Sequence, residues 1–421
     1  MNYLKIIAGS AFLRVAGVGF GFLAHLFMAR LLGAEEFGVF NFFFAIASIL
    51  AMIGSFGFPN ALTRFTQEYL AKSDTKPILK RLILFTQGFS VFLSIVIAGL
   101  VFAALYQIPK FSHLGLHNFI AAILLTLSWS VLKVNSGALR GLKKINLSVL
   151  YETVWRDGLL ALCLAVAFFM NPQNGLAETW LYWSALLSFL GVLTSQYTIH
   201  KAVKTIDKPE EALIYPYKYW LLTSMPMMLV SGVRLLMMRT DLIILGVVMS
   251  TANVGIYAAA VKIAGLVAIA QMAVMPYFSP HAAEHYAKKE ISSLRNLFVQ
   301  MTKLQSLASL ILIIGMFALA PFLLGWMGEE FKAGFAALMI LAVSQWLGAS
   351  CGPAANLLIM SGKERIVMWM ILAAALINIP LTFAFIQFWG IEGAALATAI
   401  VFIGQSIAPL IYAKKTILLN D

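Results

Sequence analysis

The chain has 421 residues, of which 61% are hydrophobic and only 11% are charged, and its formal net charge is +12. An average soluble domain is about 25% charged, so a water-soluble surface is excluded for most of this chain. The two cysteines, Cys163 and Cys351, lie inside long apolar runs, which argues against a disulfide framework and a metal site. In a soluble protein this charge would indicate nucleic acid as a partner, but its distribution along the chain has another explanation.

Apolar segments long enough to cross a bilayer follow one another along the chain, since each helical crossing needs about 20 residues. The first has no small-residue cleavage site, so we expect it to stay as a span and not to be removed as a signal peptide. In chain order the spans are predicted over residues 10–31, 40–60, 82–105, 118–139, 149–170, 180–199, 220–247, 256–279, 300–325, 335–360, 367–388 and 393–412. The sequence therefore predicts an all-α polytopic membrane protein with about twelve transmembrane helices.

The connecting segments alternate in charge. One set holds most of the Lys and Arg residues, at Lys5, Arg64, Lys72, Lys76, Lys80, Arg81, Arg140, Lys143, Lys144, Lys201, Lys204, Lys208, Lys218, Lys288, Lys289, Arg295, Lys303, Lys363, Arg365, Lys414 and Lys415. The opposite set holds Arg30, Lys110 and Lys332, with Glu35, Glu36, Glu178, Glu329 and Glu330. Because positive residues stay on the cytoplasmic side, both termini are predicted to be cytoplasmic. No connecting segment is long enough for an extramembrane catalytic domain.

The chain contains an internal repeat at an offset of 217 residues, at which Phe37–Phe40 falls on Val254–Tyr257. The same offset pairs Pro59 with Pro276, Tyr69 with Tyr286 and Lys72 with Lys289. A weaker echo relates Asn174–Ala177 to Glu392–Ala395. Chance is the alternative, because small residues recur in membrane helices.

The repeat predicts two pseudo-symmetric six-helix lobes in the same orientation, residues 1–205 and 217–421, joined by a cytoplasmic linker at residues 206–216. Two parallel halves related by an axis along the membrane normal are a transporter architecture. The substrate path then lies between the halves, and one half rocks against the other to give alternating access.

Nine ionisable residues lie inside predicted spans, where each costs at least about 2.5–3.5 kcal/mol and needs a reason. They are Arg14, Lys133, Arg156, Arg234, Arg239, Lys262, Glu152, Asp157 and Asp241. Arg14, Lys133 and Lys262 lie near helix ends, so they either snorkel to the headgroups or face a cavity. Arg156 and Asp157 either form structural ion pairs, with Glu152 one turn away, or serve the substrate.

Arg234 lies near the middle of its span, where snorkelling is difficult. Asp241 follows seven residues later, nearly two helical turns on, so we expect both side chains on one face, with Arg239 pointing elsewhere. The planar fork of arginine donates two hydrogen bonds to phosphate together. We predict a cationic, substrate-binding cavity formed by Arg234, Arg14, Arg239, Lys262 and Arg156.

Ion or proton coupling, or charge balance, is predicted for Asp241, Asp157, Glu152 and His25. For His25 the alternative is a packed, neutral histidine. Pro59, Pro226 and Pro276 are predicted hinges near the cytoplasmic side; alternatively these prolines mark helix ends. No catalytic residue, metal site or cofactor is predicted, since the sequence has no Walker loop.

Three loose motifs, in order along the chain, resemble bacterial polysaccharide-exporting flippases. They are Ala29–Gly33 with Glu36–Phe40, Asp241–Gly246 with Asn253–Tyr257, and Asn378–Pro380 with Gly390–Thr398. The similarity covers essentially the whole chain. The chain therefore resembles the Wzx-like branch of the multidrug/oligosaccharidyl-lipid/polysaccharide (MOP) exporter superfamily.

The resemblance implies a V-shaped bundle of two lobes with a cavity lined mainly by the first, second, seventh and eighth spans. It implies transfer of an undecaprenyl-pyrophosphate-linked oligosaccharide, for O-antigen, capsule or exopolysaccharide, from the inner to the outer leaflet of the bacterial inner membrane. Membrane lipids and other polysaccharide assembly proteins are then the expected partners, and nucleic acid is not. Related lipid II flippases usually carry two further helices, so peptidoglycan precursor is not the expected cargo.

Two other functions remain open. A multidrug/cation antiporter of the same superfamily would need acidic cavity residues, whereas the charges inside these spans are net basic. A membrane-embedded polysaccharide polymerase or ligase typically has a large periplasmic loop with Arg and His. The longest outer segment here is short, and an ordinary surface loop accounts better for its His113 and His117.

Overall fold

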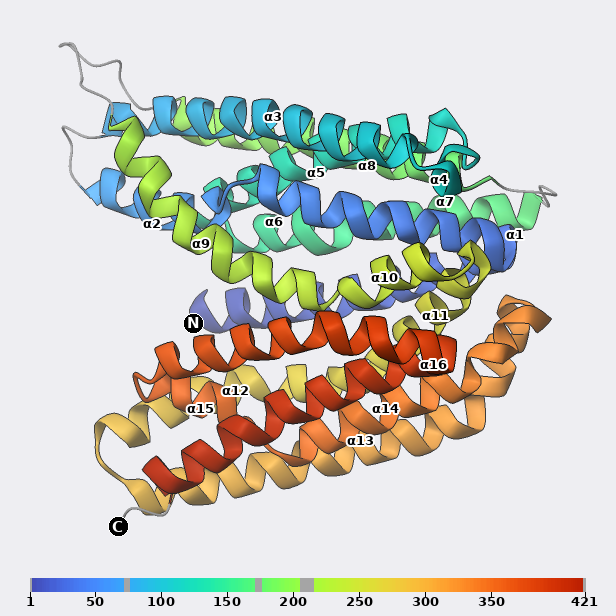
Figure 1. Ribbon diagram of the computed structural model, residues 1–421. Coiled ribbons are helices and arrows are strands. Elements are labelled where there is room, and N and C mark those ends of the chain that lie inside the picture. Colours follow the sequence, from blue (N-terminus) through green and yellow to red (C-terminus); the bar gives the residue numbers. More distant parts are fainter. Residues whose placement is uncertain (1, 72–75, 171–175, 205–215, 419–421) are drawn as a thin grey trace. The chain divides into compact units, whose positions relative to one another are not determined.

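The computed structural model describes residues 2–71, 76–170, 176–204 and 216–418. For residues 2–8, 10–11, 71, 76–77, 230, 234 and 276 only the backbone is described. Every regular element in the described ranges is a helix (Figure 1), which confirms the all-α prediction.

The elements up to the eighth α-helix are α1 (Asn2–Gly54), α2 (Phe58–Ala71), α3 (Lys76–Tyr106), α4 (Pro109–Ser112), α5 (Leu116–Gly141), α6 (Ile145–Val149), the π-helix η2 (Leu150–Val154), α7 (Trp155–Met170) and α8 (Ala177–Val203). The following elements are α9 (Tyr217–Met237), α10 (Thr240–Val248), α11 (Thr251–Ala264), η3 (Gly265–Ala268), α12 (Ile269–Ala287), α13 (Ile291–Met327), η4 (Glu329–Gly334), α14 (Phe335–Ser350), α15 (Ala354–Met360), α16 (Glu364–Ala413) and η5 (Lys414–Leu418).

Within the described residues, nine helical stretches are long and apolar enough to cross a membrane. Two of them, Phe12–Leu70 with 59 residues and Glu364–Leu418 with 55, are more than twice the length that one crossing needs. Each holds a glycine with non-helical dihedrals, Gly33 and Gly390, which divides it into two spans. With α8, which is 27 residues long, these helices account for the twelve predicted spans.

Contacts group the chain into two units. Unit 1 comprises Met1–Leu32 and Val39–Leu235, and unit 2 comprises Gly33–Gly38 and Leu236–Asp421. By contacts, α9 up to Leu235 therefore belongs to unit 1. The predicted lobes were defined by the repeat, so their boundaries stay a prediction about pseudosymmetry and not about packing.

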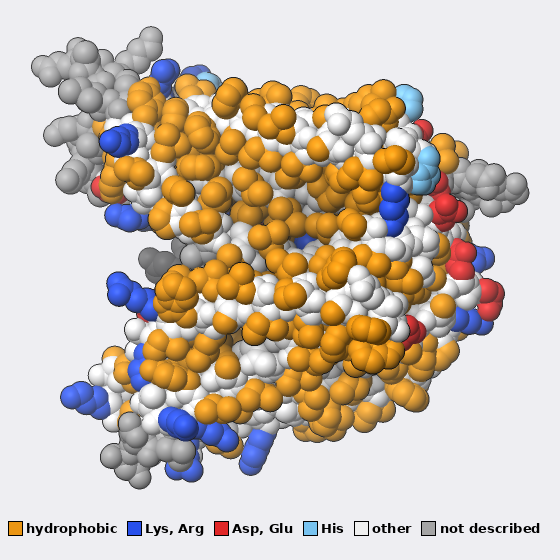
Figure 2. Space-filling view, in the orientation of Figure 1, with side chains coloured by type: hydrophobic (Ala, Val, Ile, Leu, Met, Phe, Trp, Pro, Cys, Tyr) orange, Lys and Arg blue, Asp and Glu red, His pale blue; other side chains and the backbone are white. Residues whose placement is uncertain are grey.

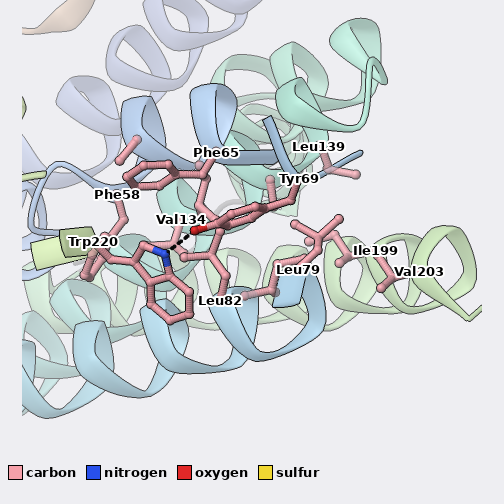
Figure 3. Packing of buried hydrophobic residues seen from close by; sticks show 14 of the residues in the cluster. Phe58, Phe65, Tyr69, Leu79, Leu82, Val134, Leu139, Ile199, Val203 and Trp220 are labelled. Carbon is pink, nitrogen blue, oxygen red and sulfur yellow. Dashed lines mark hydrogen bonds between the residues drawn. The ribbon is translucent and has the colours of Figure 1, made fainter. Parts of the chain in front are cut away.

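A shared aromatic core holds α9 in unit 1. Trp220 of α9 is fully buried, and its indole Nε1 donates a 2.7 Å hydrogen bond to the hydroxyl of Tyr69 on α2. Figure 3 shows this pair beside Phe58 and Phe65, with aliphatic side chains of α3, α5 and α8 closing the cluster. Since a buried indole N–H needs a partner, this bond permits a tryptophan at the centre of an apolar core.

Unit 2 has a corresponding core in which α12, α13, α15 and α16 meet. It contains Phe278 of α12, Leu294 and Phe298 of α13, Leu357 of α15 and Val367 of α16. The 3-10 turn η3 separates α11 from α12, so the predicted span over residues 256–279 is interrupted.

At Gly33 the chain leaves one helix and begins the next, and the first residue of the new helix is held by a side chain of unit 2. Gly33 has φ 70°, which a residue with a side chain rarely adopts. Immediately after it, the backbone N–H of Ala34 donates to Oε1 of Glu330, at 2.5 Å. A carboxylate at this position satisfies a free N–H at the start of the helix that follows and complements its dipole.

Two glycines at repeat-equivalent positions contact each other's helix. A Cβ added to Gly38 would lie 1.7 Å from the carbonyl oxygen of Thr251, and one added to Gly255 would lie 2.1 Å from that of Ala34. The contact is reciprocal at the predicted offset, because Ala34 corresponds to Thr251 and Gly38 to Gly255. This reciprocity, which is the pattern of an isologous contact, supports the internal repeat.

Charge is distributed unevenly along the helices of each unit. On the face in Figure 2, hydrophobic side chains cover the lengths of the helices, most Lys and Arg side chains gather at one end, and most Asp and Glu side chains at the other. The basic end of unit 1 is where α5 and α8 end, at Arg140 and Lys201, and the opposite end includes Glu178 at the start of α8. This is the pattern of a membrane protein with a strong topological preference.

Candidate functional site

The site is best described from the point where α5 ends and η2 begins. Arg140, in the last turn of α5, forms a 3.2 Å ion pair with Glu152, and the two side chains are about a quarter and a third exposed. Glu152 lies in the five-residue π-helix η2, and such wide turns are frequently found at functional sites. One of the two alternatives for Arg156 and Asp157 was a set of structural ion pairs that included Glu152; in the structure Glu152 pairs with Arg140.

Arg156, at the start of α7, pairs with its neighbour Asp157. Its Nε and Nη2 lie 2.7 and 2.6 Å from Oδ1 of Asp157. The guanidinium carbon lies 4.2 Å from the ring centre of Trp129 and 5.0 Å from that of Phe44, both within cation–π range. The third nitrogen, Nη1, is buried and has no hydrogen-bond partner among the described residues.

Lys133 brings a third cation to the same region. It lies one turn after Trp129 on α5, and its ammonium is 5.3 Å from the centre of the Trp129 ring. Lys133 also lines a cavity of about 160 Å³ together with Arg140 and Glu152. The other lining residues come from the break between α1 and α2, from the start of α2 and from α9: Met52, Ser55, Gly57, Pro59, Asn60 and Ser231.

We call Lys133, Arg140, Glu152, Arg156 and Asp157 the unit 1 charge cluster. Three cations and two carboxylates leave one formal positive charge, inside a helical bundle where ionised groups are costly. The cavity beside it also carries the hydroxyls of Ser55 and Ser231 and the amide of Asn60, which donates a 3.3 Å hydrogen bond to Ser231. A net-positive cavity lined by such polar groups can hold an anion.

The break before α2 lets polar groups reach this cavity. Phe56 and Gly57 both have positive φ, at 49° and 71°, and Pro59 follows in the first turn of α2. The backbone of Pro59 lies against Gly137 of α5, where an added Cβ would come within 2.4 Å of the proline carbonyl oxygen. Pro59 therefore lies at a break between two helices, beside a close helix contact.

His25 lies on α1 among aromatic rings of its own unit. It is buried, its Nδ1 hydrogen-bonds the carbonyl oxygen of Gly21 at 2.7 Å, and the rings of Phe40 and Phe44 stand edge-on to it. Since the partner of Nδ1 is a carbonyl acceptor, this nitrogen carries the proton. This geometry is that of a packed histidine.

Unit 2 contains one buried carboxylate among the predicted residues. Asp241, on α10, accepts a 2.7 Å hydrogen bond from the hydroxyl of Tyr257 and a 2.8 Å bond from the backbone N–H of Leu242. The Tyr257 hydroxyl lies 3.5 Å from that of Thr398 on α16. Asp241 is thus held by one donor from α11 and one from its own helix, and it can act as a protonatable or cation-binding group.

The predicted continuous helix over residues 220–247 is wrong. The chain leaves the helix after Met237 and restarts at Thr240, with Arg239 in the N-cap position of α10. Because the helix is interrupted, the seven-residue spacing of Arg234 and Asp241 no longer predicts that both side chains share one face. The side chain of Arg234 lies outside the described residues.

The remaining predicted residues are dispersed. Arg14 is exposed on α1, and Lys262 is half-buried in the last turn of α11. Pro226 lies inside α9, while the side chain of Pro276, in α12, falls outside the described residues. Of the predicted cavity cations, the structure places only Arg156 in the unit 1 charge cluster.

Sequence reasoning missed two residues of this region. Arg140 was assigned to a cytoplasmic connection, but α5 extends to Gly141 and includes it. Trp129 was not singled out, although a tryptophan four residues before an intramembrane lysine is on the same helix face. Another groove of unit 1, about 740 Å³ on α5 and α8, is lined mostly by apolar side chains such as Leu124, Trp183 and Phe189, and none of its described lining residues is charged.

Solved structures with this fold are membrane transporters. An inward-facing MATE multidrug resistance transporter of the MOP superfamily matches with a TM-score of 0.74 at 14% identity, covering 97% of this chain and 98% of that one. A MOP superfamily transporter from Pyrococcus furiosus, described as having a binding pocket of reversed polarity, gives 0.66 at 14%, covering 99% and 97%. The lipid II flippase MurJ gives 0.64 at 14%, covering 98% and 88%. The fold is therefore that of a multi-pass MOP superfamily transporter.

The sequence narrows this class to one family. Residues 7–281 match the family described as polysaccharide biosynthesis protein, and the chain belongs to that family. A probable low-salt glycan biosynthesis flippase of Haloferax volcanii is 24% identical over 399 residues, which cover 92% of this chain and 78% of the relative. The predicted Wzx-like resemblance is thereby confirmed.

Proposed function

We propose that the protein flips an undecaprenyl-pyrophosphate-linked oligosaccharide from the inner to the outer leaflet of the bacterial cytoplasmic membrane by alternating access. The observation that carries the proposal is the buried Nη1 of Arg156, a cationic donor that has no partner among the described residues. A phosphate oxygen is the kind of acceptor that a guanidinium N–H recognises best. Family membership and the Haloferax volcanii relative support the same class of cargo.

The unit 1 charge cluster suits a pyrophosphate more than a drug cation. Asp157 already uses Nε and Nη2 of Arg156, and the rings of Trp129 and Phe44 hold the guanidinium in place. A cation entering here would meet a net positive charge, whereas an anion gains a charge-assisted hydrogen bond worth about 1.5–3 kcal/mol. The oligosaccharide needs a hydrated path, and the lipid tail can remain in the bilayer.

Several finer assignments belong to this proposal. Arg14, Arg234, Arg239 and Lys262 are proposed as further cations on the cargo's route, and Asp241 as the group that couples transport to a proton or cation. Pro59, Pro226 and Pro276 are proposed hinges. Both termini are proposed to be cytoplasmic, and the cargo to be a repeat unit of O-antigen, capsule or exopolysaccharide. No bond is made or broken in this scheme, so we propose that the protein is not an enzyme.

The proposal is tested with the full chain reconstituted in liposomes that carry a fluorescent undecaprenyl-pyrophosphate oligosaccharide. A membrane-impermeant reductant bleaches the label only in the outer leaflet, so transfer from the inside increases the bleached fraction. We expect the wild-type chain to increase it well above protein-free liposomes, and an ion gradient to increase it further.

Two results would overturn the proposal. Proton-coupled efflux of a cationic dye without any transfer of the lipid-linked oligosaccharide would assign the protein to the antiporters. Lengthening of the oligosaccharide by the purified chain would assign it to the polymerases. The first assay follows dye fluorescence, and the second follows the mass of the released glycan.

A further inference from the structure

A second cavity of unit 1 lies at the basic end of the bundle and shares no lining residue with the cavity beside the charge cluster. It measures about 290 Å³ and lies between α3 and α8, which both pack on α5 (Figure 1). Three lining residues come from one face of α3: Lys80, Ile83 and Leu84. The other five come from one face of α8: Gln196, Ile199, His200, Val203 and Lys204. We call this the α3–α8 pocket.

The polar lining of the α3–α8 pocket is basic. Lys80, His200 and Lys204 lie among its lining residues, and none of the lining residues that the structure describes is a carboxylate. Gln196 faces it as well, and its Oε1 accepts a 2.6 Å hydrogen bond from Gln87, which leaves the NH₂ end of the amide as a further donor. Gln87 also bonds Asn135 at 2.7 Å, so the floor of the pocket is tied to α5.

The apolar lining of the pocket is exposed on one side. Leu84 is 58% exposed, and Tyr197, next to Gln196 on α8, is 69% exposed, while Ile83, Ile199 and Val203 are buried beneath. On a membrane-spanning helix such exposed apolar residues face lipid. The pocket therefore offers a cationic end beside an apolar wall, which matches a molecule with an anionic head and a hydrocarbon tail.

The size of the pocket limits the head. A volume of about 290 Å³ corresponds to roughly ten water molecules. It holds a phosphate with a glycerol-sized substituent, but an oligosaccharide of several sugars is too large. In other membrane proteins, basic pockets between helices on the cytoplasmic side bind the negatively charged head groups of lipids.

We propose that the α3–α8 pocket is a binding site for a resident anionic phospholipid of the leaflet at the basic end, the cytoplasmic leaflet in the orientation proposed above. Lys80 and Lys204 contact the phosphate, Gln196 and His200 donate hydrogen bonds, and Leu84 lies along the acyl chain. The site is separate from the one proposed for the cargo. Either proposal can fail without the other.

The test uses the purified, delipidated full chain titrated with phosphatidylglycerol or phosphatidylcholine, with bound lipids counted by native mass spectrometry. Each lysine near a phosphate contributes about fivefold in affinity, so the double variant Lys80→Gln/Lys204→Gln should weaken phosphatidylglycerol binding roughly 30-fold. Its control, Lys201→Gln/Lys218→Gln, removes two exposed lysines at the same end that do not line the pocket, and should bind like wild type. Lys80→Arg/Lys204→Arg should restore binding.

Four results would overturn the assignment. The first is equal binding of both phospholipids by the wild-type chain, and the second is an equal loss in the pocket and control variants. The third is displacement of phosphatidylglycerol by one equivalent of undecaprenyl pyrophosphate, with the same dependence on Lys80 and Lys204, which would make the pocket a cargo site. Displacement by millimolar inorganic phosphate alone would likewise contradict a lipid site. Transfer of cargo in the liposome assay is a separate readout.

Discussion

Arg156 is stacked on Trp129 and Phe44 and bonded to Asp157, so its orientation is fixed before any cargo arrives. A fixed guanidinium loses little conformational entropy when it binds, and preorganisation of this kind increases affinity without further contacts. Removing one partner of a buried ion pair is costly, since it leaves the other charge uncompensated. Effects of Arg156 on transport and on folding must therefore be separated.

We predict that the charge-balanced variant Arg156→Gln/Asp157→Asn folds and inserts but transfers the lipid-linked oligosaccharide at least about tenfold more slowly, as expected for loss of one charge-assisted hydrogen bond. Arg156→Lys, which keeps the charge but not the fork, should be slowed less. The liposome transfer assay measures both.

The matched control is Arg295→Gln, which removes an exposed arginine from α13. It should transfer cargo at the wild-type rate. If Arg156→Gln/Asp157→Asn transferred the cargo at the wild-type rate, Arg156 would not be part of the cargo's path.

Asp241 allows a second prediction. Asp241→Asn keeps the shape of the side chain but removes its charge, so transfer driven by an ion gradient should fall to the rate seen without a gradient. Comparing the two rates in the same liposomes tests this. Equal stimulation of wild type and Asp241→Asn by the gradient would show that coupling lies elsewhere.

Tyr257→Phe tests the bond that holds Asp241. It leaves a buried carboxylate without its 2.7 Å donor, and we expect a loss of about 1–3 kcal/mol in the free energy of unfolding. Thr398→Val removes a more distant hydroxyl and should cost less. The thermal midpoint of the purified protein measures both; an unchanged midpoint for Tyr257→Phe would mean that the bond does not stabilise the fold.

For individual residues, the sequence was sufficient to identify the charged side chains inside the predicted spans but not their partners. Arg156, Asp157 and Glu152 stand out because ionised groups are rare in spans. Their pairing could not be read from spacing, because the π-helix η2 shifts the register and the turn between α5 and α6 brings Arg140 to Glu152, twelve residues later. The role of Trp129 depends on the same packing.

Two long helices of this protein are divided at glycines where the predicted spans also divide, and a third division lies where the sequence predicted none. Gly33 and Gly390 have positive φ, and glycine is the residue that permits it. The predicted spans over residues 10–31 and 40–60 agree with the division at Gly33, since turn and charge signals coincide there. The break at Met238 and Arg239 lies in a stretch with no glycine or proline between Gly232 and Gly246, so the sequence predicted one helix over residues 220–247 where the structure has two.

The close contact of Gly38 and Gly255 with each other's helix allows a prediction about helix packing. Gly38→Ala and Gly255→Ala each place a methyl group within 1.7 or 2.1 Å of a backbone oxygen, so the helices must move apart. Overpacking typically costs about 1–3 kcal/mol, and we expect both variants to lower the thermal midpoint and the folded yield.

Gly99→Ala on α3 is the control, because its Cβ would meet nothing within 4 Å. Alanine is the better helix former, so this variant should be neutral or slightly more stable. If Gly38→Ala and Gly255→Ala behaved like Gly99→Ala, close packing at the repeat positions would not contribute to stability.

The orientation of the whole molecule in the membrane depends on which helix ends carry Lys and Arg, and not on how the helices pack. Lys and Arg at a helix end resist transfer across the membrane, and Asp and Glu contribute little to the preference. This is why the number of spans and their alternation could be predicted from the sequence, although pairing inside the bundle could not. The same argument predicts that the basic end of each unit faces the cytoplasm.

Labelling of single cysteines tests that orientation. After Cys163→Ala and Cys351→Ala, a cysteine is introduced at one of four exposed positions: Lys110 or Glu329 at the acidic end, and Lys201 or Lys288 at the basic end. A membrane-impermeant maleimide added to intact cells should label Lys110→Cys and Glu329→Cys only. Lys201→Cys and Lys288→Cys should react after the membrane is permeabilised. Labelling of the second pair in intact cells, with the first pair silent, would mean that the chain is inserted the other way. The α3–α8 pocket would then face the outer leaflet, and a cargo bound first from the cytoplasm would enter from the acidic end.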